Sequence, residues 1–429
     1  MRISAPSRTE RFGAVRIYEV QEVWELDSGR DAIGAPTALD YQTVLQIPAA
    51  WISDIERQMV VVVPAKNERL KVIDGVLSGI PHDCLIVMVS NSSRDPIDRY
   101  QMECETLSRF CRVTHRPAVM VHQRDEGLAV AFTAAGMPEL VGEDGLVRHG
   151  KGEGMLVGLA LAELTGRRYV GFVDADNYVP GAVHEYVKAF AAGFHLAQTP
   201  YSLVRISWRT KPKIVKNRIF FNCWGRTSQV TNRFLNLLLA DYSGFGTEVI
   251  TTGNAGEHAI SMELARHMRF GSGYSVEPYE YLHLFEEYGG VLGSGHPEVM
   301  KAGVEVFQIE TRNPHFHEDK GVDHVEEMRV QALNTLYHSA VCTPAVREEI
   351  KAFQAEHDEL GPDGEPARER IYPAIENLDF ATFASVLADR ATTFRQLRAE
   401  RITHKAPGEP PIVMEEVITS PVSPDEASS

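Results

Sequence analysis

The chain has 429 residues and a formal net charge of −16, with 43 Lys and Arg residues against 59 Asp and Glu residues. This acidic balance argues against a nucleic-acid partner and against binding to an anionic membrane surface. No run approaches the ~20 apolar residues that a membrane-spanning helix needs, and the first residues do not form a signal-peptide pattern. The five cysteines are scattered without a CxxC pair, so we expect reduced thiols in a cytoplasmic protein.

Apolar runs and helical patterns alternate through the first part of the chain. A helix or strand is expected over 19–26. Strands are then predicted over 59–63, where Pro64 ends the run, over 85–89 and 118–122, and from Tyr169; helices are predicted over 68–77, 95–112, 127–136 and 154–164. This alternation is typical of βαβ units and a mostly parallel sheet. We therefore predict an α/β fold with a Rossmann-like sheet and helices on both faces.

The alternation weakens beyond residue 195. Strands are predicted over 197–206 and 304–309, and helices over 229–239, 322–338, 344–356 and 380–401. The last residues are rich in Pro, Glu and Ser, which favours a disordered tail. We accordingly divide the chain into portions 1–195, 196–340, 341–405 (C-terminal helices) and 406–429 (tail).

Two carboxylates follow the apolar run that starts at Tyr169. Asp174 and Asp176 are separated only by Ala175, and residues i and i+2 of an extended segment point the same way. At the carboxyl end of a strand, such a pair suits Mg²⁺ or Mn²⁺ bridging a diphosphate. The alternative is an Asx turn that ends the strand before Pro180 opens a helix.

Three more loops are expected at the same edge of the sheet. The loop Pro64, Ala65, Lys66, Asn67, Glu68 can hold a nucleobase and ribose, unless Asn67 only caps the next helix. Ser90 ends the next strand on the same edge. Lys151 stands among Gly150, Gly152 and Gly154, where backbone and charge can approach a phosphate, although a flexible surface loop would have the same pattern.

The segment from Tyr186 to Ala240, which we call the basic segment, contains no Asp or Glu. Its basic residues are Lys188, Arg205, Arg209, Lys211, Lys213, Lys216, Arg218, Arg226 and Arg233. They either pair with acids elsewhere in the fold or bind a phosphorylated or carboxylated small molecule. Within the segment, Gly225, Arg226, Thr227 and Ser228 offer hydroxyls and a guanidinium, or form a capped helix start.

Two further motifs carry candidate catalytic or metal-binding groups. Glu257 follows Gly256 among small residues, and could face a reaction centre, orient a hydroxyl or cap a helix. His315 and His317 follow a predicted strand, and either imidazole is a plausible ligand for a metal already held by Asp176.

Together these motifs resemble the mannosyl-3-phosphoglycerate synthase family, from about Thr9 to about His338. The resemblance implies a metal-dependent glycosyltransferase of the GT-A type that retains anomeric configuration. It implies transfer of mannose from GDP-mannose to 3-phosphoglycerate, which gives the phosphorylated precursor of the compatible solute mannosylglycerate. The cofactor would be Mg²⁺, or Mn²⁺ or Co²⁺. Helical surfaces after Val322 allow a homodimer.

The resemblance also implies roles for individual residues. Portion 1–195 would bind the nucleotide sugar, with Pro64, Ala65, Lys66, Asn67, Glu68 and Ser90 on guanosine and Lys151 on ribose or diphosphate. Asp174, Ala175 and Asp176 would serve ribose and metal, and a histidine of the pair His315/His317 would complete the metal site. Portion 196–340 would seat the acceptor on Gly225, Arg226, Thr227, Ser228 and Arg312, by similarity to the related glucosyl-phosphoglycerate enzymes. Asp174, Asp176 and Glu257 are the candidate catalytic residues.

Three rival functions remain open on the sequence. One is the same transfer with GDP-glucose or UDP-glucose as donor. Another is a sugar-phosphate nucleotidylyltransferase, which the loop Pro64–Glu68 disfavours because it is not rich in Gly and Arg. The third is a non-catalytic nucleotide-binding regulator. Since no residue is an obvious covalent nucleophile, we expect a front-face mechanism in which the leaving phosphate takes the acceptor proton.

Overall fold

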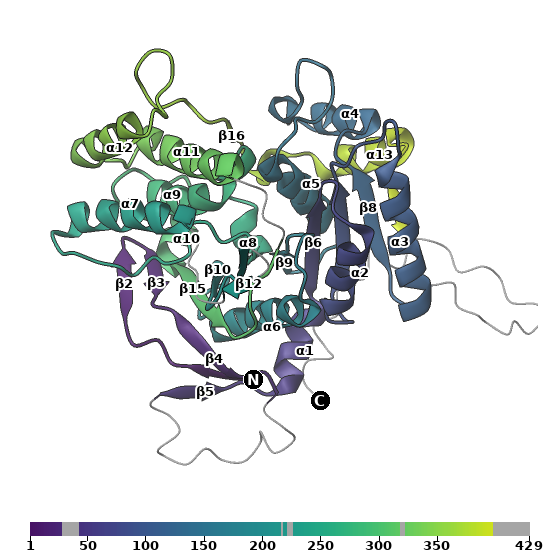
Figure 1. The fold of residues 1–429 in the computed structure, drawn as a ribbon, viewed down its shortest axis with the longest axis horizontal. Helices are drawn as coiled ribbons and strands as arrows, with labels where there is room; N and C mark the ends of the chain where they lie inside the picture. Colours follow the sequence, from purple (N-terminus) through teal and green to yellow (C-terminus); the bar gives the residue numbers. More distant parts are fainter. Residues whose placement is uncertain (28–42, 216–217, 221–225, 318–321, 398–429) are drawn as a thin grey trace, which may run out of the picture.

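A single large sheet organises the molecule in the computed structural model, which describes residues 1–27, 43–215, 218–220, 226–317 and 322–397 (Figure 1). Its strand order is β17-β8-β7-β6-β9-β13-β10-β15-β4-β1-β5, with β3 also paired to β15 and β2 paired to β3. Strands from both sides of residue 195 therefore share one sheet. Among the described residues, no helix has both the length and the apolar character that crossing a bilayer requires.

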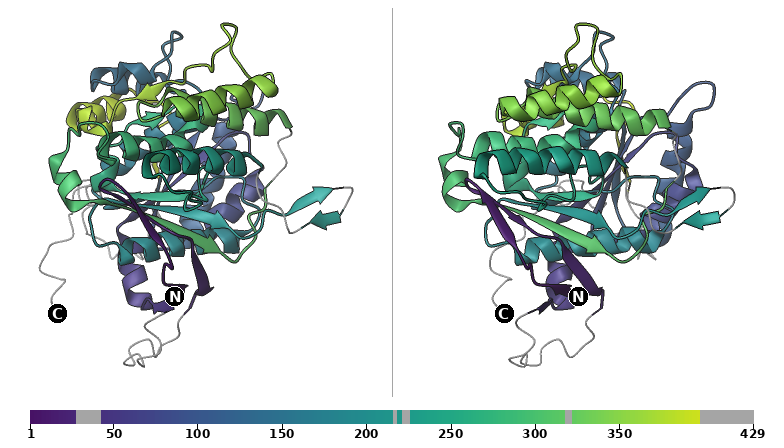
Figure 2. Two further views of the ribbon diagram at one scale, coloured as in Figure 1. Left: turned by 90° about the vertical axis from the view of Figure 1, so that its left-hand side faces the viewer. Right: turned by 60° about the vertical axis from the view of Figure 1, so that its left-hand side comes forward.

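The strands of this sheet are short to medium in length. Their bounds are β1 Arg2–Ser4, β2 Thr9–Phe12, β3 Val15–Tyr18, β4 Gln21–Glu25, β5 Val44–Gln46, β6 Met59–Ala65, β7 Leu85–Ser90, β8 Ala118–His122, β9 Tyr169–Phe172, β10 Ser202–Trp208, β13 His258–Ser261, β15 Val304–Thr311 and β17 Arg395–Leu397. Two small pairs stand apart, β11 Lys213–Val215 with β12 Arg218–Phe220, and β14 Phe270–Gly271 with β16 Ile371–Tyr372. Figure 2 shows the hairpin β11–β12 projecting from the body of the protein.

The helices connect these strands and cover the sheet. Their bounds are α1 Ala49–Arg57, α2 Leu70–Gly79, α3 Arg99–Thr114, α4 Glu126–Ala134, α5 Lys151–Glu163, α6 Pro180–Leu196, α7 Arg226–Ser243, α8 Met262–Ala265, α9 Val276–Tyr288, α10 Pro297–Ala302, α11 Val322–His338, α12 Pro344–Glu356 and α13 Phe380–Arg390. Single 3₁₀ turns are η1 Pro138–Leu140, η2 Gly273–Ser275 and η3 Ile375–Asn377.

Both faces of the sheet are buried, as predicted for an α/β fold with helices on each side. Along β6 the side chains alternate: Val60 and Val62 join one hydrophobic core, whereas Met59, Val61 and Val63 join the other. Residues of α1, α2, α3 and α6 pack in the second core, and residues of α4, α5, α7, α9, α11, α12 and α13 pack in the first. Figure 1 shows α7, α11 and α12 lying beside one another on that side.

The directions of the strands bring several loops to one edge. Strands β6, β7, β8 and β9 are parallel, so their carboxyl ends share that edge. Strand β13 runs antiparallel to β9 with His258 opposite Phe172, and therefore begins where β9 ends. Strand β10 is antiparallel to β13 and parallel to β15, so the loops after Trp208 and Thr311 reach the same edge.

Three predicted elements differ most from the structure. The strand predicted over 197–206 begins only at Ser202 and continues to Trp208 as β10. Strand β6 continues through Pro64 to Ala65. Pro64 has no N–H to donate, but the neighbouring strand β9 already ends at Phe172, so no ladder hydrogen bond is lost at this position. The helix predicted over 380–401 is wrong beyond Arg390, where the chain turns into β17. Residues 398–405 of the portion 341–405 and the whole predicted tail, 406–429, lie outside the described part of the chain.

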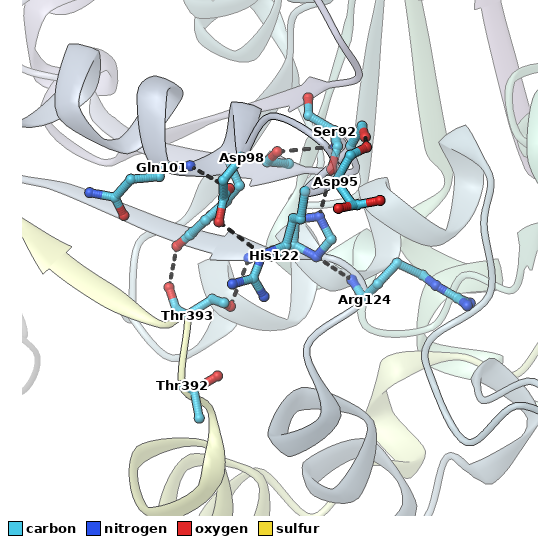
Figure 3. A network of polar contacts seen from close by, with 12 residues as sticks. Ser92, Asp95, Asp98, Gln101, His122, Arg124, Thr392 and Thr393 are labelled. Atoms are coloured by element: carbon cyan, nitrogen blue, oxygen red, sulfur yellow. Dashed lines mark hydrogen bonds and ion pairs between the residues drawn. The ribbon is translucent and has the colours of Figure 1, made fainter.

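The turn that begins β17 is fixed by side chains from the end of β8 (Figure 3). The backbone N–H and hydroxyl of Thr393 both donate to Asp125 Oδ2, at 2.8 and 2.7 Å, and Thr392 Oγ1 donates to the same atom at 3.1 Å. The backbone N–H of His122 in turn donates to Thr393 Oγ1 at 3.1 Å. These bonds replace the helical ones that would have continued α13, and β17 then pairs antiparallel with β8.

Candidate active site

A cavity of about 1020 Å³ opens at the edge where these loops meet. The predicted site residues in its wall are Pro64, Ala65, Lys66, Glu68, Lys151, Asp174, Ala175, Asp176, Ser228, Glu257, His315 and His317. They come from the end of β6 and the loop after it, from the loops after β9 and β15, from the first turns of α5 and α7, and from the residue before β13. The strand directions thus gather side chains that lie as much as 250 residues apart in the sequence.

Three predicted residues are not part of the cavity wall. Ser90 is fully buried, and its hydroxyl donates to Glu103 Oε2 at 2.6 Å. Asn67 does not cap a helix either; its Oδ1 accepts from the N–H of Ser93 at 2.9 Å, which joins the first two loops. Arg312 lies over the ring of Trp24, 4.9 Å from the ring centroid, and donates to the carbonyl of Val23.

The predicted acceptor motif is only partly described. Gly225 lies outside the described residues, and the side chains of Arg226 and Thr227 are likewise not described. The backbone of Arg226 begins α7, and Ser228 in the first turn of that helix is in the cavity wall. The motif therefore includes the start of a helix, which was one of the two alternatives predicted for it.

Lys151 is held between two carboxylates. Its ammonium lies 2.8 Å from Asp174 Oδ1, 2.9 Å from Asp174 Oδ2 and 2.8 Å from Glu277 Oε1. Burial opposes the charge, but both carboxylates favour it, and the pKa of Lys151 is raised well above its usual value. Lys151 is thus part of a buried ion-pair network, and the alternative of a flexible surface loop is wrong.

Gly256 makes this arrangement sterically possible. A Cβ atom at position 256 would lie 2.7 Å from Asp174 Oδ2 and 3.0 Å from the Lys151 ammonium. Both distances are shorter than carbon normally tolerates, so any side chain here would push the carboxylate away from the ammonium.

Glu257 is a fully buried carboxyl group beside this network. Its Oε1 accepts from Asn177 Nδ2 at 2.9 Å, and Asn177 Nδ2 also donates to the carbonyl of Asp174 at 2.9 Å. Burial and then the negative charge of Asp174 raise the pKa of Glu257 to about 8, so the neutral acid prevails at neutral pH. The alternative of a helix cap is wrong, because strand β13 follows.

The two histidines stand on the same wall as Asp176. The His315 ring stacks on Trp208 at 4.5 Å between centroids, and its Nδ1 lies 3.2 Å from the hydroxyl of Tyr186. The rings of His315 and His317 are 5.0 Å apart. Burial, and secondly the charge of Lys211, lowers the pKa of His315 well below its usual value, which keeps the imidazole neutral.

The described cations of the basic segment lie in two kinds of surroundings. Lys188 pairs with Glu56 at 2.8 Å, Arg205 is buried in a pair with Glu280, and Arg233 reaches Glu349 at 3.5 Å. These three cations serve pairing within the fold. Lys211 instead lies in the cavity wall, 3.7 Å from the ring centroid of Trp208, and burial lowers its pKa to about 8.

Sequence reasoning missed several residues of the wall. Glu277 belongs to α9, about 120 residues after Lys151, and no local motif marks it. Arg69, Tyr274 and Gln331 also contribute to the wall. Lys211 belongs to the basic segment and was therefore a candidate for ligand binding. The sequence does not distinguish it from Lys188 or Arg205 in the same segment.

Solved structures of one other enzyme show a low similarity to this chain. One is glucosyl-3-phosphoglycerate synthase from Mycobacterium tuberculosis in complex with Mn²⁺, UDP-glucose and phosphoglyceric acid, which is 21% identical, with a TM-score of 0.45 and coverage of 69% of this chain and 85% of that one. The same enzyme with Mn²⁺, UDP-glucose and glycerol 3-phosphate is 19% identical, with a TM-score of 0.46 and coverage of 75% and 87%.

Closer similarity is found in sequence. The family model for mannosyl-3-phosphoglycerate synthase matches residues 5–387. Mannosyl-3-phosphoglycerate synthase of Pyrococcus furiosus is 45% identical over 394 residues, which cover 92% of this chain and 98% of that protein. The synthase of Aeropyrum pernix is 35% identical, with coverage of 92% and 99%. On these matches, the chain belongs to the mannosyl-3-phosphoglycerate synthase family.

Proposed function

We propose that this protein transfers mannose from GDP-mannose to 3-phosphoglycerate with retention of configuration, as a GT-A-type glycosyltransferase. The observation that carries the proposal is the cavity at the carboxyl edge of the sheet, where Asp174, Asp176 and the histidine pair share a wall with Lys151 and Lys211. A nucleotide diphosphate and a phosphorylated acceptor both need such a mixture of metal ligands and cations.

The donor set fits a divalent cation. Asp176 supplies a carboxylate, and His315 supplies an imidazole that burial keeps neutral, which is the form that binds metals. Among the described residues, the buried atoms Glu257 Oε2 and Asn177 Oδ1 make no hydrogen bond, and the nearest printed neighbour of Glu257 Oε2 is His315 Nδ1 at 3.8 Å. We propose that Asp176 and one histidine of the pair hold Mg²⁺, Mn²⁺ or Co²⁺. When bound, the cation would neutralise charge on the leaving diphosphate.

Lys211 is the best-supported cation for the acceptor. It faces the cavity from the loop after β10, and Ser228 of α7 adds a hydroxyl to the same wall. In this proposal Lys211 takes the role that the family resemblance implied for Arg312, whose guanidinium lies over Trp24. A phosphate and a carboxylate on one acceptor then meet positive charge in an otherwise acidic protein.

The neutral state of Glu257 supports a front-face reaction. A protonated carboxyl is a poor nucleophile, so a covalent glycosyl intermediate on Glu257 is disfavoured. In the proposed step the bond from the sugar carbon to the diphosphate breaks, the acceptor oxygen bonds to the same face, and its proton passes to the leaving phosphate oxygen. Asn177 and Glu257 are joined by a hydrogen bond, and we propose that this pair positions the donor.

The setting of this reaction is also part of the proposal. We place the protein in the cytoplasm with small-molecule substrates and without a nucleic-acid or membrane partner, in line with its net charge of −16. A homodimer through the surfaces after Val322 remains a prediction.

The decisive assay follows GDP release from GDP-mannose with and without 3-phosphoglycerate, in the presence of Mg²⁺. We expect release that depends on the acceptor, stops with EDTA and falls at least 100-fold in Asp176→Ala. The control is Asp389→Ala, whose carboxylate is exposed on α13. GDP-glucose and UDP-glucose in parallel rank the donors. Absence of acceptor-dependent release with every donor would refute the proposal. In a separate reaction, release of pyrophosphate from GTP and mannose 1-phosphate would indicate a nucleotidylyltransferase.

A further inference from the structure

A second group of metal-binding side chains lies outside the cavity wall. His267 follows α8, His296 immediately precedes α10, and Glu376 belongs to η3. One ligand atom from each lies within 4.8 Å of the others. His267 Nδ1 is 2.6 Å from Glu376 Oε2, and His296 Nε2 is 3.5 Å from Glu376 Oε1.

We propose that His267, His296 and Glu376 bind one divalent transition-metal ion of the Zn²⁺ class. Two imidazoles and a carboxylate are a frequent ligand set for zinc, whereas Mg²⁺ and Ca²⁺ prefer oxygen ligands throughout. Ligand atoms around a tetrahedral zinc ion with bonds of ~2.1 Å lie roughly 3.4 Å apart. The observed separations need only small side-chain rotations to reach that geometry.

Two buried polar groups behind the cluster provide independent support. His283 of α9 is 1% exposed, and its ring nitrogens make no well-formed hydrogen bond to a side chain of the described residues, although the backbone of His267 lies close to the ring. The Tyr288 hydroxyl is also buried and has no hydrogen-bond partner among the described residues; its ring centroid lies 6.1 Å from that of His283 and 6.5 Å from that of His296. Neither side chain is one of the three whose ligand atoms lie within 4.8 Å of one another, so one of them, or a water molecule, would move in to complete a fourth position.

A second carboxylate lies near His296. Metal-bound histidines usually donate a hydrogen bond from their second nitrogen to a carboxylate, which fixes the tautomer and strengthens the ligand. Here His296 Nδ1 lies 3.6 Å from Glu298 Oε1, just beyond hydrogen-bond distance, while Nε2 faces Glu376 at 3.5 Å. We expect the exposed Glu298 side chain to close this gap when Nε2 binds the ion.

The site would join parts of the chain that are distant in sequence. Positions 267 and 296 flank α9, whereas position 376 belongs to the C-terminal segment that also carries β16. Tyr372 of β16 donates a hydrogen bond to Glu153 of α5, the helix that begins with Lys151. An ion bound at these three side chains would thus fasten the segment that supports one wall of the cavity.

The test counts zinc bound to the purified full-length protein. After treatment with chelator, the protein is loaded with Zn²⁺ alone, desalted and analysed for zinc per chain. We expect His296→Gln to retain one equivalent less than wild type. His357→Gln, which removes the exposed histidine that follows the last residue of α12, controls for loss of an imidazole and should retain the wild-type amount. Equal zinc content in wild type and His296→Gln would overturn the proposal.

Affinity and stability provide a second readout. Glu298→Gln should weaken zinc binding at this site by about 10- to 100-fold. Zn²⁺ should raise the melting temperature of wild type more than that of Glu376→Gln, in which only the cavity can still bind the ion. Transferase activity with Mg²⁺ reports whether each variant is folded, and it separates failure of this site from failure of the proposed function. Identical zinc affinity and identical zinc-induced stabilisation in all variants would mean that the cluster is only a hydrogen-bonded histidine network.

Discussion

Position 256 shows how a single missing side chain can decide whether a site forms. Gly256→Ala would place a Cβ against Asp174 and Lys151, and one of the two must move. We predict at least a tenfold loss in kcat/KM for GDP-mannose, with little change in the melting temperature. Steady-state kinetics test this. Gly246→Ala is the control, because nothing lies within 4 Å of the position its Cβ would take. Equal kinetics in the two variants would exclude a role for the Lys151–Asp174 contact.

Lys211 carries a second prediction at the scale of one residue. Lys211→Met keeps the length of the side chain over Trp208 but removes the charge from the cavity. We predict that KM for 3-phosphoglycerate rises at least tenfold while KM for GDP-mannose changes less than threefold. The exposed Lys71→Met should alter neither value. A larger effect on the donor than on the acceptor would contradict the assignment of Lys211.

Individual residues could be predicted from the sequence only up to a point. Asp174, Asp176 and Lys151 were found because a strand followed by carboxylates, or glycines before a helix, fixes where a side chain must lie. Ser90 and Arg312 belong to equally suggestive motifs, yet Glu103 binds the Ser90 hydroxyl and Trp24 lies beneath the Arg312 guanidinium. Both of these partners come from other elements, and a local motif does not reveal them.

At the scale of elements, a hydrogen bond joins β16 to α5, the helix whose first residue is Lys151 of the cavity wall. The hydroxyl of Tyr372 donates to Glu153 Oε1 at 2.7 Å, and the N–H of Gly273 donates to Glu153 Oε2 at 3.1 Å. Glu153 is 2% exposed, and burial raises its pKa. Loss of the Tyr372 hydroxyl would leave the buried Glu153 carboxyl group with one hydrogen bond fewer.

We predict that Tyr372→Phe lowers the free energy of unfolding by about 1–3 kcal/mol, the usual cost of an unsatisfied buried polar group. Urea denaturation measures the change. Tyr337→Phe is the matched control, because its hydroxyl donates at 2.6 Å to Glu365, whose side chain is 42% exposed. Water can replace that bond, so the control should lose less than about 0.5 kcal/mol. Equal losses would show that burial of Glu153 adds nothing.

The end of a helix could be predicted where the residues that form it lie close together in the sequence. Helix α12 begins at Pro344 as predicted, and the Thr343 hydroxyl accepts from the N–H of Val346. The end of α13 was missed because its signal is not local. Thr393 leaves the helix to bind Asp125, which lies 268 residues earlier in the chain.

At the scale of the whole molecule, buried histidines connect stability to pH. Burial lowers the pKa of His122, His184, His195 and His283. His122 is a clear example: the N–H of Arg124 donates to its Nδ1 at 3.2 Å, so Nε2 carries the proton that is donated to the carbonyl of Ser92 at 2.9 Å (Figure 3). Protonation of Nδ1 would break the first of these bonds.

The sign of the effect follows from linkage. Below pH 6.5, the usual pKa of histidine, the unfolded chain takes up a proton at His122 that the folded chain does not, because burial lowers the pKa of His122 in the folded state. The free energy of unfolding therefore falls as the pH drops from about 6.5, with a slope of up to ~1.4 kcal/mol per pH unit for each such histidine. We predict that His122→Gln reduces this slope between pH 6.5 and pH 5 relative to wild type. Denaturation at several pH values measures it, with the exposed His82→Gln as control. A slope that His122→Gln leaves unchanged would contradict the prediction.

The pairing of β17 with β8 has a consequence for how the protein is made. The donor on β8 and the acceptor beside β17 are 271 residues apart, so β8 leaves the ribosome long before its outer partner exists. At about 5–20 residues per second, that interval is roughly 15–55 s. During this time the outer backbone groups of β8 are open to pairing with another chain, as at any uncovered sheet edge. Newly made protein should therefore be most prone to aggregation just before its C-terminal segment emerges, and a chain that stops after α12 should never lose that tendency.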